Sequence, residues 1–260
     1  MSLLKAQDLS FQVKERYLLQ HVGFSVEPGE FLAVIGRNGA GKTTLLRLLT
    51  NDLTPKTGKI EIFGRPLAEF AQKDLATKRA VLAQSTPLNF AFEVLEVVLL
   101  GRIPHERTAS SFEQDLEIAM AALAQVGLQG FERRNYLTLS GGEQQRVQLA
   151  RTLCQIATDS PERLLFLDEP TSSLDVSHQH RVLETAKKIC HEGAGVFAIL
   201  HDINLAAQYA DKVLILAGGR KVAFGPTADV LKADILSAAF QHNIMVTDHP
   251  RLNCKLIVTC

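Results

Sequence analysis

The strongest constraint on the fold is a glycine-rich loop that directly follows a short apolar run. Residues 31–35 read Phe-Leu-Ala-Val-Ile, which is typical of a buried strand, and residues 36–43 match G-x-x-x-x-G-K-T at every fixed position. Three glycines let the backbone curl so that successive N–H groups point at one anion, and the start of a helix adds partial positive charge there. A strand, a phosphate loop and a helix in this order predict an α/β fold.

The same loop predicts the kind of ligand. Lys42 is expected to bridge the outer two phosphates of a nucleoside triphosphate, and the Thr43 hydroxyl is expected to bind Mg²⁺. Guanine-nucleotide enzymes usually carry the tetrapeptide Asn-Lys-x-Asp, which is missing from this sequence. We therefore expect ATP and Mg²⁺ as the cofactors.

Strand-like and helical segments alternate along the rest of the sequence. Apolar runs predict strands at residues 31–35, 59–63, 79–83, 164–167, 196–200, 212–216 and 221–224, and helical patterns occupy residues 42–50, 113–126, 141–156, 178–191 and 203–209. This alternation predicts an α/β fold with a P-loop NTPase core and a parallel sheet. We also expect an antiparallel β part near the N-terminus and a mostly helical insertion.

The length and composition fit one domain with its own core. The chain has 260 residues, of which 46% are hydrophobic. This is enough to fill a hydrophobic core that needs no disulfide bond or metal ion to stabilise it. We expect a single domain over residues 1–260, with its core at about 1–85 and 157–225. The helical insertion covers about 86–156. The tail covers about 226–260, with a helical stretch at 227–240 and a terminal hairpin around residues 249–251.

Charge, cysteines and histidines exclude several classes of function. The 28 basic and 28 acidic residues cancel, which argues against a chain that coats nucleic acid. The four cysteines form no CxxC pair, so closely spaced metal ligands are missing and a reducing compartment is expected. His178 and His180 would lie about 200° apart on a helix, so we expect a solvated face and assign no heme site there. No run of 18 apolar residues is present.

Two adjacent acids end a predicted strand. Residues 164–167 are apolar, and Asp168 and Glu169 follow at the sheet edge where open α/β sheets bind ligands. Neighbouring residues on a strand point to opposite sides, so the two acids are expected to have different tasks. Asp168 would belong to the Mg²⁺ shell, and Glu169 would orient or deprotonate the attacking water.

A second helix start is open to an anion. Ser140 and Glu143 have the spacing of a capping box, and Gly141 and Gly142 between them leave the backbone N–H groups uncovered. An ordinary capped helix explains the same residues, but a pair of glycines is rarely needed inside a helix.

Taken together, these motifs resemble the ATP-binding subunits of ABC transporters over nearly the whole chain. The string Leu-Ser-Gly-Gly-Glu at 139–143 resembles the family signature, with Glu in its last place, and residues 164–169 resemble the Walker B strand with its catalytic glutamate. Residues 173–175 resemble the D-loop, and Gln84 and His201 resemble the Q-loop glutamine and the switch histidine.

The resemblance assigns roles to individual residues. The nucleotide-binding residues would be Gly36, Arg37, Asn38, Gly39, Ala40, Gly41, Lys42, Thr43 and Thr44, with Thr43, Gln84 and Asp168 around Mg²⁺ and with Glu169 and His201 as catalytic residues. Two copies would pair head to tail, so that Ser140, Gly141, Gly142 and Glu143 of one copy, together with Asp175, act on the ATP held by the other.

The resemblance also implies partners and a location. The chain would act with membrane permease subunits and, through them, with a periplasmic substrate-binding protein, as a peripheral protein on the cytoplasmic face of the bacterial inner membrane. No nucleic-acid partner is expected. Residues 100–105 are similar to ATPases that serve importers of ferric siderophores, vitamin B12 and heme. The polar stretch at 157–163 and the ending near His249 are most similar to hemin-importer ATPases, so hemin is the expected substrate.

Two alternatives and one departure accompany this reading. The alternatives are the ATPase of a ferric-siderophore or vitamin B12 importer and, less favoured, an ABC ATPase that acts on nucleic acid or ribosomes. The departure concerns adenine, on which the family usually stacks an aromatic residue near the N-terminus. That place falls at about Val13 here, and the sequence does not choose between the nearby aromatic residues Phe11 and Tyr17.

Overall fold

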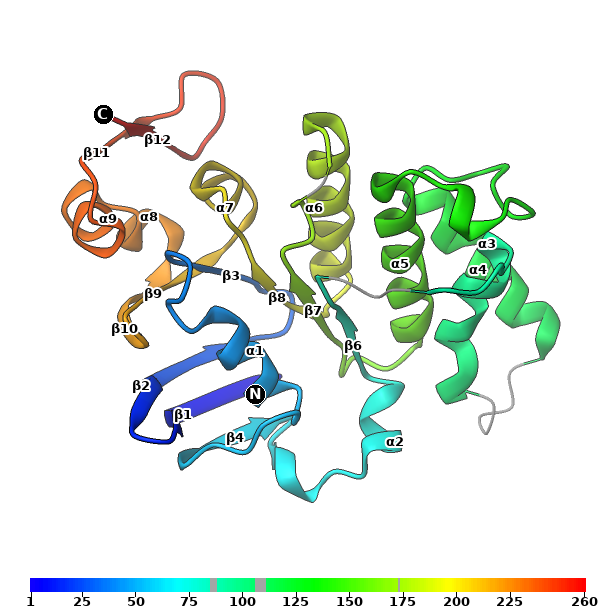
Figure 1. Ribbon diagram of the computed structural model, residues 1–260, viewed down its shortest axis with the longest axis horizontal. Helices are drawn as coiled ribbons and strands as arrows, with labels where there is room; N and C mark the ends of the chain where they lie inside the picture. The colour runs from blue at the N-terminus through cyan, green and yellow to red at the C-terminus, as the bar shows by residue number, and fades with distance from the viewer. Residues whose placement is uncertain (85–87, 106–110, 173) are drawn as a thin grey trace.

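The fold is organised around one long mixed sheet (Figure 1). A computed structural model describes residues 1–84, 88–105, 111–172 and 174–260. The strands of the sheet are β1 (Leu4–Val13), β2 (Arg16–Val26), β3 (Phe31–Ile35), β4 (Thr57–Ile62), β5 (Arg65–Pro66), β6 (Arg79–Leu82), β7 (Leu164–Asp168), β8 (Gly195–Ile199), β9 (Lys212–Ala217) and β10 (Arg220–Pro226). Their spatial order is β5-β4-β1-β2-β10-β9-β3-β8-β7-β6.

The sheet has a parallel half and an antiparallel half. Strands β9, β3, β8, β7 and β6 run parallel to one another, whereas β1, β2, β4 and β5 form an antiparallel group from the N-terminal part of the chain. Strand β10 joins the two groups, since it pairs antiparallel with β9 and parallel with β2. This arrangement confirms the predicted fold class. It places the ends of β3, β7 and β8 at the same edge of the sheet, where the loops that follow them meet.

Helices cover both faces of the parallel half. They are α1 (Lys42–Leu49), α2 (Gln72–Ala76), α3 (Val94–Leu99), α4 (Phe112–Gln125), α5 (Gly141–Ile156), α6 (Val176–His191), α7 (Ile203–Tyr209), α8 (Thr227–Val230) and α9 (Ala233–Phe240). Alternate residues of β3 face two different cores: Leu32 and Val34 pack with the leucines of α1, whereas Phe31, Ala33 and Ile35 pack in the core that includes α5, α6 and α7. Full burial on both faces explains why the strand reads as a continuous apolar run.

The segment between β6 and β7 is helical in the part that the structure describes. It contains α3, a 3₁₀ helix over Leu100–His105, α4 and α5. The acids Glu93 and Glu96, which interrupt the most apolar stretch of the sequence, form the capping box of α3, since the Glu93 N–H donates to Glu96 Oε2 at 2.8 Å. These charges start a helix whose apolar residues Val94, Val97 and Val98 are buried.

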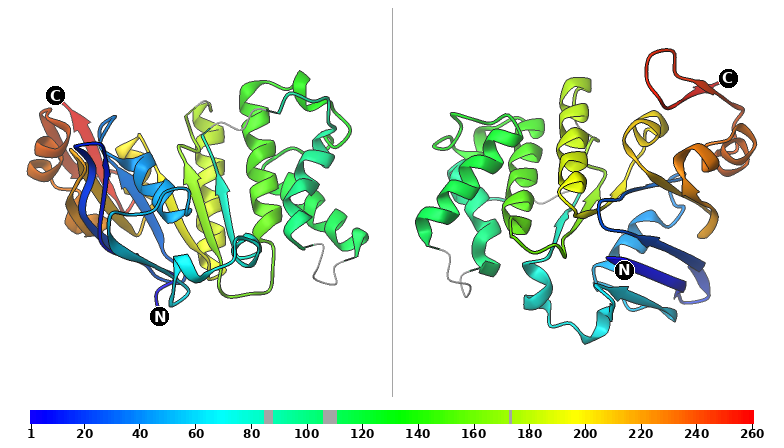
Figure 2. Two further views of the ribbon diagram at one scale, coloured as in Figure 1. Left: turned by 60° about the horizontal axis from the view of Figure 1, so that its bottom comes forward. Right: turned by 180° about the vertical axis from the view of Figure 1, so that it is seen from behind.

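The C-terminal tail lies at the opposite end of the molecule from these helices (Figure 2). The predicted helical stretch at 227–240 is two helices, α8 and α9, because Leu231 buries its side chain and Lys232 takes an extended conformation. The predicted hairpin is present as β11 (Ile244–Asp248) paired with β12 (Lys255–Thr259). No helix in the described ranges combines the length and apolar character needed to cross a bilayer.

Candidate nucleotide site

A cavity of about 460 Å³ opens at the edge of the sheet where β3, β7 and β8 end. Its lining combines residues that are far apart in the sequence: Arg16, Leu18, Asn38, Gly39, Ala40, Gly41, Lys42, Thr43, Thr44, Gln84, Glu169 and His201. Most of the predicted phosphate loop therefore meets Gln84, Glu169 and His201 in one place.

The loop needs glycine at two positions for different neighbours. Gly36 has φ 153°, and a Cβ there would lie 2.2 Å from the Leu216 carbonyl oxygen. Gly41 has φ 101°, and its Cβ would lie 2.7 Å from the Leu18 carbonyl oxygen. The loop is thus pressed between β9 and β2, and only glycine allows that approach.

Lys42 starts helix α1 and turns back over the loop. Its Nζ donates to the Gly36 carbonyl at 2.7 Å and to the Arg37 carbonyl at 3.2 Å. Burial lowers the pKa of Lys42, and the nearby Glu169 and Asp168 carboxylates oppose that shift. The ammonium group is therefore held at the centre of the anion-binding loop.

Glu169 lies just beyond the end of β7 with both carboxylate oxygens engaged. Gln84 Nε2 donates to Oε2 at 2.7 Å, and His201 Nε2 lies 2.5 Å from Oε1. The backbone at Glu169 is left-handed, with φ 51°, a conformation that costs a non-glycine residue about 1–3 kcal/mol. The fold therefore holds this carboxylate at a fixed place facing the phosphate loop.

Asp168, the last residue of β7, is buried with an unused oxygen. Its Oδ1 has no hydrogen-bond partner among the residues that the structure describes. Burial raises the pKa of Asp168 and Glu169 raises it further, whereas Lys42 and His201 oppose the shift. Carboxylate, hydroxyl and amide oxygens are ligands that Mg²⁺ prefers, so the orphaned oxygen of Asp168 and the cavity-lining Thr43 and Gln84 suit a magnesium ion by their chemistry.

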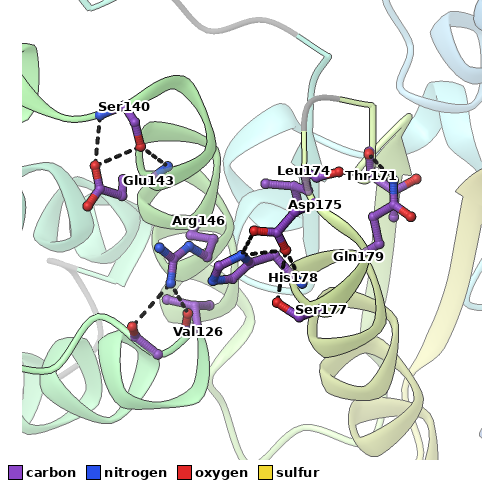
Figure 3. A network of polar contacts seen from close by, with 11 residues as sticks. Val126, Ser140, Glu143, Arg146, Thr171, Leu174, Asp175, Ser177, His178 and Gln179 are labelled. Carbon is purple, nitrogen blue, oxygen red and sulfur yellow. Dashed lines mark hydrogen bonds and ion pairs between the residues drawn. The ribbon is translucent and has the colours of Figure 1, made fainter.

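The start of α5 is a closed capping box (Figure 3). The Ser140 N–H and Oγ–H both donate to Glu143 Oε2, at 2.8 and 2.7 Å, and the Glu143 N–H donates to Ser140 Oγ at 3.3 Å. The Ser140 hydrogen bonds lower the pKa of Glu143. A Cβ on Gly141 would meet no atom within 4 Å, so this helix start faces open space.

Asp175 caps the start of α6 and is engaged within its own chain (Figure 3). It accepts hydrogen bonds from the His178 N–H at 2.9 Å and from Ser177 Oγ at 2.9 Å, and His178 Nδ1 lies 2.8 Å from the same oxygen. These donors lower the pKa of Asp175 to about 2. Ser173, the first residue of the predicted D-loop, lies outside the described residues.

The sequence predicts a solvated helix face at His178 and His180, whereas the structure leaves both residues only partly exposed and gives each a partner. His178 contacts the Asp175 carboxylate, and its side chain is 29% exposed. His180 Nδ1 lies 2.7 Å from the Tyr209 hydroxyl, and the two rings are 5.7 Å apart. His178 thus belongs to the cap of its own helix, whereas His180 joins α6 to α7, a contact that the helical period alone could not reveal.

The structure does not bring every predicted residue to the cavity. Gly36, Arg37 and Asp168 are absent from its described lining, although each lies close in the sequence to residues that do line it. Ser140, Gly141, Gly142, Glu143 and Asp175 are also absent from its described lining. In a single chain, the second anion-binding helix start therefore does not face the phosphate loop.

Two residues that line the cavity were not predicted from the sequence. Arg16 and Leu18 alternate on β2 and both line the cavity, and the Leu18 carbonyl oxygen lies close to Gly41. Tyr17 lies between them on the strand and so points to the other side, where Lys56 Nζ is 5.5 Å from its ring. Val13 pairs with Arg16 across the hairpin. The period of two along β2 is the signal that could have found them.

Sequence comparisons match this chain to one protein family and to similar proteins over nearly its whole length. Residues 19–172 match the family described as ABC transporter. A hemin import ATP-binding protein HmuV from Deinococcus radiodurans is 54% identical over 256 residues, which cover 98% of this chain and 97% of that protein. The HmuV of Gloeobacter violaceus is 46% identical and is covered to 94%.

Solved structures of ABC transporters and their cassettes are similar over most or all of the chain. A metal-chelate type ABC transporter in an inward-facing conformation is similar with a TM-score of 0.81 and 29% identity, covering 100% of this chain and 98% of that one. A dimeric bacterial ABC transporter cassette has a TM-score of 0.75 and 26% identity, covering 86% of this chain and 98% of that one.

Proposed function

The chain belongs to the ABC transporter family, and from that premise we propose that it is the ATP-hydrolysing subunit of a hemin importer. One observation carries the enzymatic part of the proposal. Glu169 faces the phosphate loop with one oxygen on Gln84 and the other on His201, inside a single cavity. A carboxylate fixed in this way is suited to accept a proton from a water that attacks the terminal phosphate.

Each residue around the cavity then has a task in hydrolysis. Residues 36–44 surround the phosphates with N–H groups, and Lys42 neutralises the outer two. Glu169 accepts the proton of the attacking water, and His201 holds Glu169 and contacts the γ-phosphate. Mg²⁺ bound by Thr43, Gln84 and Asp168 would stabilise the charge that develops on the phosphates.

The second half of the site comes from a second copy of the chain. Ser140, Gly141, Gly142 and Glu143 of one copy cover the γ-phosphate bound by the other, and Asp175 acts at the same interface. Support comes from the open space in front of Gly141 and from the dimeric form of a similar cassette. The capping box uses the N–H groups of Ser140 and Glu143, and the N–H groups of Gly141 and Gly142 between them are suited to a phosphate.

The base is held by Arg16 and Leu18 in place of an aromatic residue. The phosphate loop would hold the phosphates of the nucleotide, and these two side chains line the same cavity. A guanidinium plane can lie flat on adenine, and Leu18 and Val13 provide apolar contact beside it.

Hemin is the cargo that the relatives favour. The two most similar relatives reported above are both named for hemin import and align over nearly their whole length. The chain would bind permease subunits at the cytoplasmic face of the inner membrane, with the substrate-binding protein acting through them. Ferric siderophores and vitamin B12 are the competing cargoes.

Growth of a deletion strain tests the cargo. The gene is removed, and cells are grown on hemin as sole iron source, on a ferric siderophore, or under vitamin B12 dependence. Wild-type and Glu169→Gln genes are then returned separately. Loss on hemin alone, rescued only by the wild-type gene, is the expected result. Loss confined to a siderophore or to vitamin B12 would refute hemin and leave the ATPase in place.

A further inference from the structure

The C-terminal hairpin is joined to helix α7 by one side chain. Asn204 Nδ2 donates to the Ile257 carbonyl at 3.1 Å, and the Ile257 N–H donates to Asn204 Oδ1 at 2.8 Å. An amide thus pairs in both directions with one residue of β12, as a neighbouring strand would. Ile257 itself is buried, so these main-chain groups depend on Asn204 for partners.

Asn204 lies in the first turn of the helix that follows His201. Asp202 caps this helix by accepting hydrogen bonds from the N–H groups of Asn204 and Leu205, at 2.7 and 3.2 Å. Helix α7 has seven residues, too few to hold its position without tertiary contacts. The placement of His201 therefore depends on what fixes this first turn.

The rest of the hairpin is less closely attached to α7. A cavity of about 670 Å³ separates the hairpin loop, which includes His249 and Leu252, from the end of α7 at Tyr209. The hairpin charges Asp248 and Lys255 pair with each other at 2.6 Å. Among the described contacts, the Asn204 pair is the direct polar tie between the hairpin and the start of α7.

The tail also reaches the phosphate loop. The Arg37 guanidinium donates to Gln241 Oε1 immediately after helix α9, where Gln241 takes a left-handed conformation with φ 53°. The last part of the chain therefore contacts both the loop that binds the phosphates and the helix that follows His201.

We propose that the C-terminal hairpin positions His201, with Asn204 as the positioning residue that transmits its effect. The hairpin fixes the first turn of α7, and this turn fixes the imidazole against Glu169. The inference rests on the proposed ATPase function and adds a structural role for residues 244–259. Asn204 touches no reacting atom in this scheme, so its loss should slow the chemical step and leave nucleotide binding intact.

A double-mutant cycle with His201 tests the proposal in the full-length protein. Asn204→Ala should lower ATP turnover about tenfold, and it should change the Kd for ATP less than twofold. A loss of this size is smaller than the roughly hundredfold loss that a catalytic group misplaced by about 1 Å can cause. Gln208→Ala removes an exposed amide from the same helix and should leave turnover unchanged. In a His201→Ala background, Asn204→Ala should cause little further loss, because both changes act on one group.

Asn204→Asp is a second variant, which keeps the proposal testable if Asn204→Ala does not fold. It keeps an oxygen for the Ile257 N–H, and an acid suits the first turn of a helix, so this variant should fold and lose about threefold in turnover. Unchanged turnover in both variants would refute the proposal. So would an equal loss in the His201→Ala background, or a loss of ATP affinity as large as the loss of turnover. Glu169→Gln is measured alongside: if it retains wild-type turnover, the proposed hydrolysis site itself is wrong.

Discussion

At the scale of single residues, the chemistry depends on how Glu169 is held. Its two oxygens have different partners, an amide and an imidazole, and its backbone is held in a left-handed conformation. A carboxylate that is fixed in this way loses little entropy when water arrives, which is what a general base requires.

Replacing Glu169 by Gln should therefore separate binding from turnover. Gln keeps the size and can still bond to Gln84, but it cannot accept a proton. Phosphate release should fall at least about a hundredfold, within the usual contribution of a general base, and the Kd for ATP should be unchanged. Lys42→Ala is the contrasting variant, because it should weaken ATP affinity and turnover together. Wild-type turnover by Glu169→Gln would remove Glu169 from the role of base.

Arg16 should bind the base and not the phosphates. Arg16→Ala removes a cation–π contact worth about 0.5–1 kcal/mol at an exposed site, so the Kd for ATP should rise about two- to fivefold. The affinity for inorganic tripolyphosphate, which has no base, should not change. Tyr17→Ala, on the other side of the strand, is the matched control. Equal losses for ATP and tripolyphosphate would place Arg16 on the phosphates instead.

The sequence predicted the residues of the phosphate half far better than those of the base half. Residues 36–44 follow a fixed pattern because backbone N–H groups and two glycine conformations leave little choice of residue. The base only needs a flat or apolar neighbour, which Arg16 and Leu18 supply as well as an aromatic ring. A search for aromatic residues therefore offered Phe11 and Tyr17 without choosing between them, and the ring of Tyr17 lies beside Lys56.

At the scale of elements, the 3₁₀ helix over Leu100–His105 is locked to α4 and α5 by polar groups. Arg102 Nε donates to Asp115 Oδ1 at 2.7 Å, and its Nη1 donates to the carbonyls of Cys154 and Ala157, both at 3.0 Å. The side chains of Arg102 and Asp115 are only 7% and 16% exposed. Three elements thus share one largely buried cation.

Breaking this pair should be costly. Asp115→Ala leaves Arg102 with an uncompensated charge, so the free energy of unfolding should fall by about 3 kcal/mol in urea titrations. Asp248→Ala breaks the pair with Lys255, in which the Asp248 side chain is 87% exposed, and should cost at most about 1 kcal/mol. Similar losses for the two variants would mean that Arg102 does not depend on Asp115.

His105 should make the same region sensitive to acid. Its Nε2 lies 2.7 Å from the Gln155 carbonyl oxygen, and burial lowers the pKa of His105 below its usual value of 6.5. The unfolded chain therefore binds the proton more tightly than the folded one, so stability is lost as pH falls below about 6.5 and is fully present above it. Thermal melts at pH 5.5 and 7.5 should differ less in His105→Gln than in wild type. His242→Gln, which changes an exposed histidine, should melt with the wild-type difference.

Helices and strands were predictable wherever local patterns decide them. The ranges expected for α5 and α7 agree with the structure, because capping residues and the apolar period coincide there. The split between α8 and α9 depends on burial of Leu231 against distant parts of the chain, which no local pattern contains. The Tyr209 partner of His180 was missed for the same reason, because it lies 29 residues further along the chain.

At the scale of the whole molecule, one chain carries two halves of a site that do not face each other. The cavity holds the phosphate loop, Glu169 and His201, whereas the open helix start at Gly141 lies outside its described lining. Two copies related by a two-fold axis would bring each helix start to the other copy's phosphate loop, which makes two complete sites from one interface.

The dimer should therefore form only when ATP stays intact. Glu169→Gln with ATP and Mg²⁺ should elute from a sizing column at twice the monomer mass. With ADP it should elute at the monomer mass, because ADP lacks the γ-phosphate that the helix start of the second copy is proposed to bind.

Gly141→Asp supplies the control. Space is free around a Cβ at residue 141, and an acid suits the first turn of α5, so the monomer should fold and bind ATP normally. Its carboxylate would face the γ-phosphate of the other copy, so the double variant Glu169→Gln, Gly141→Asp should remain monomeric with ATP. A dimer in that variant would show that the helix start of α5 does not close the site.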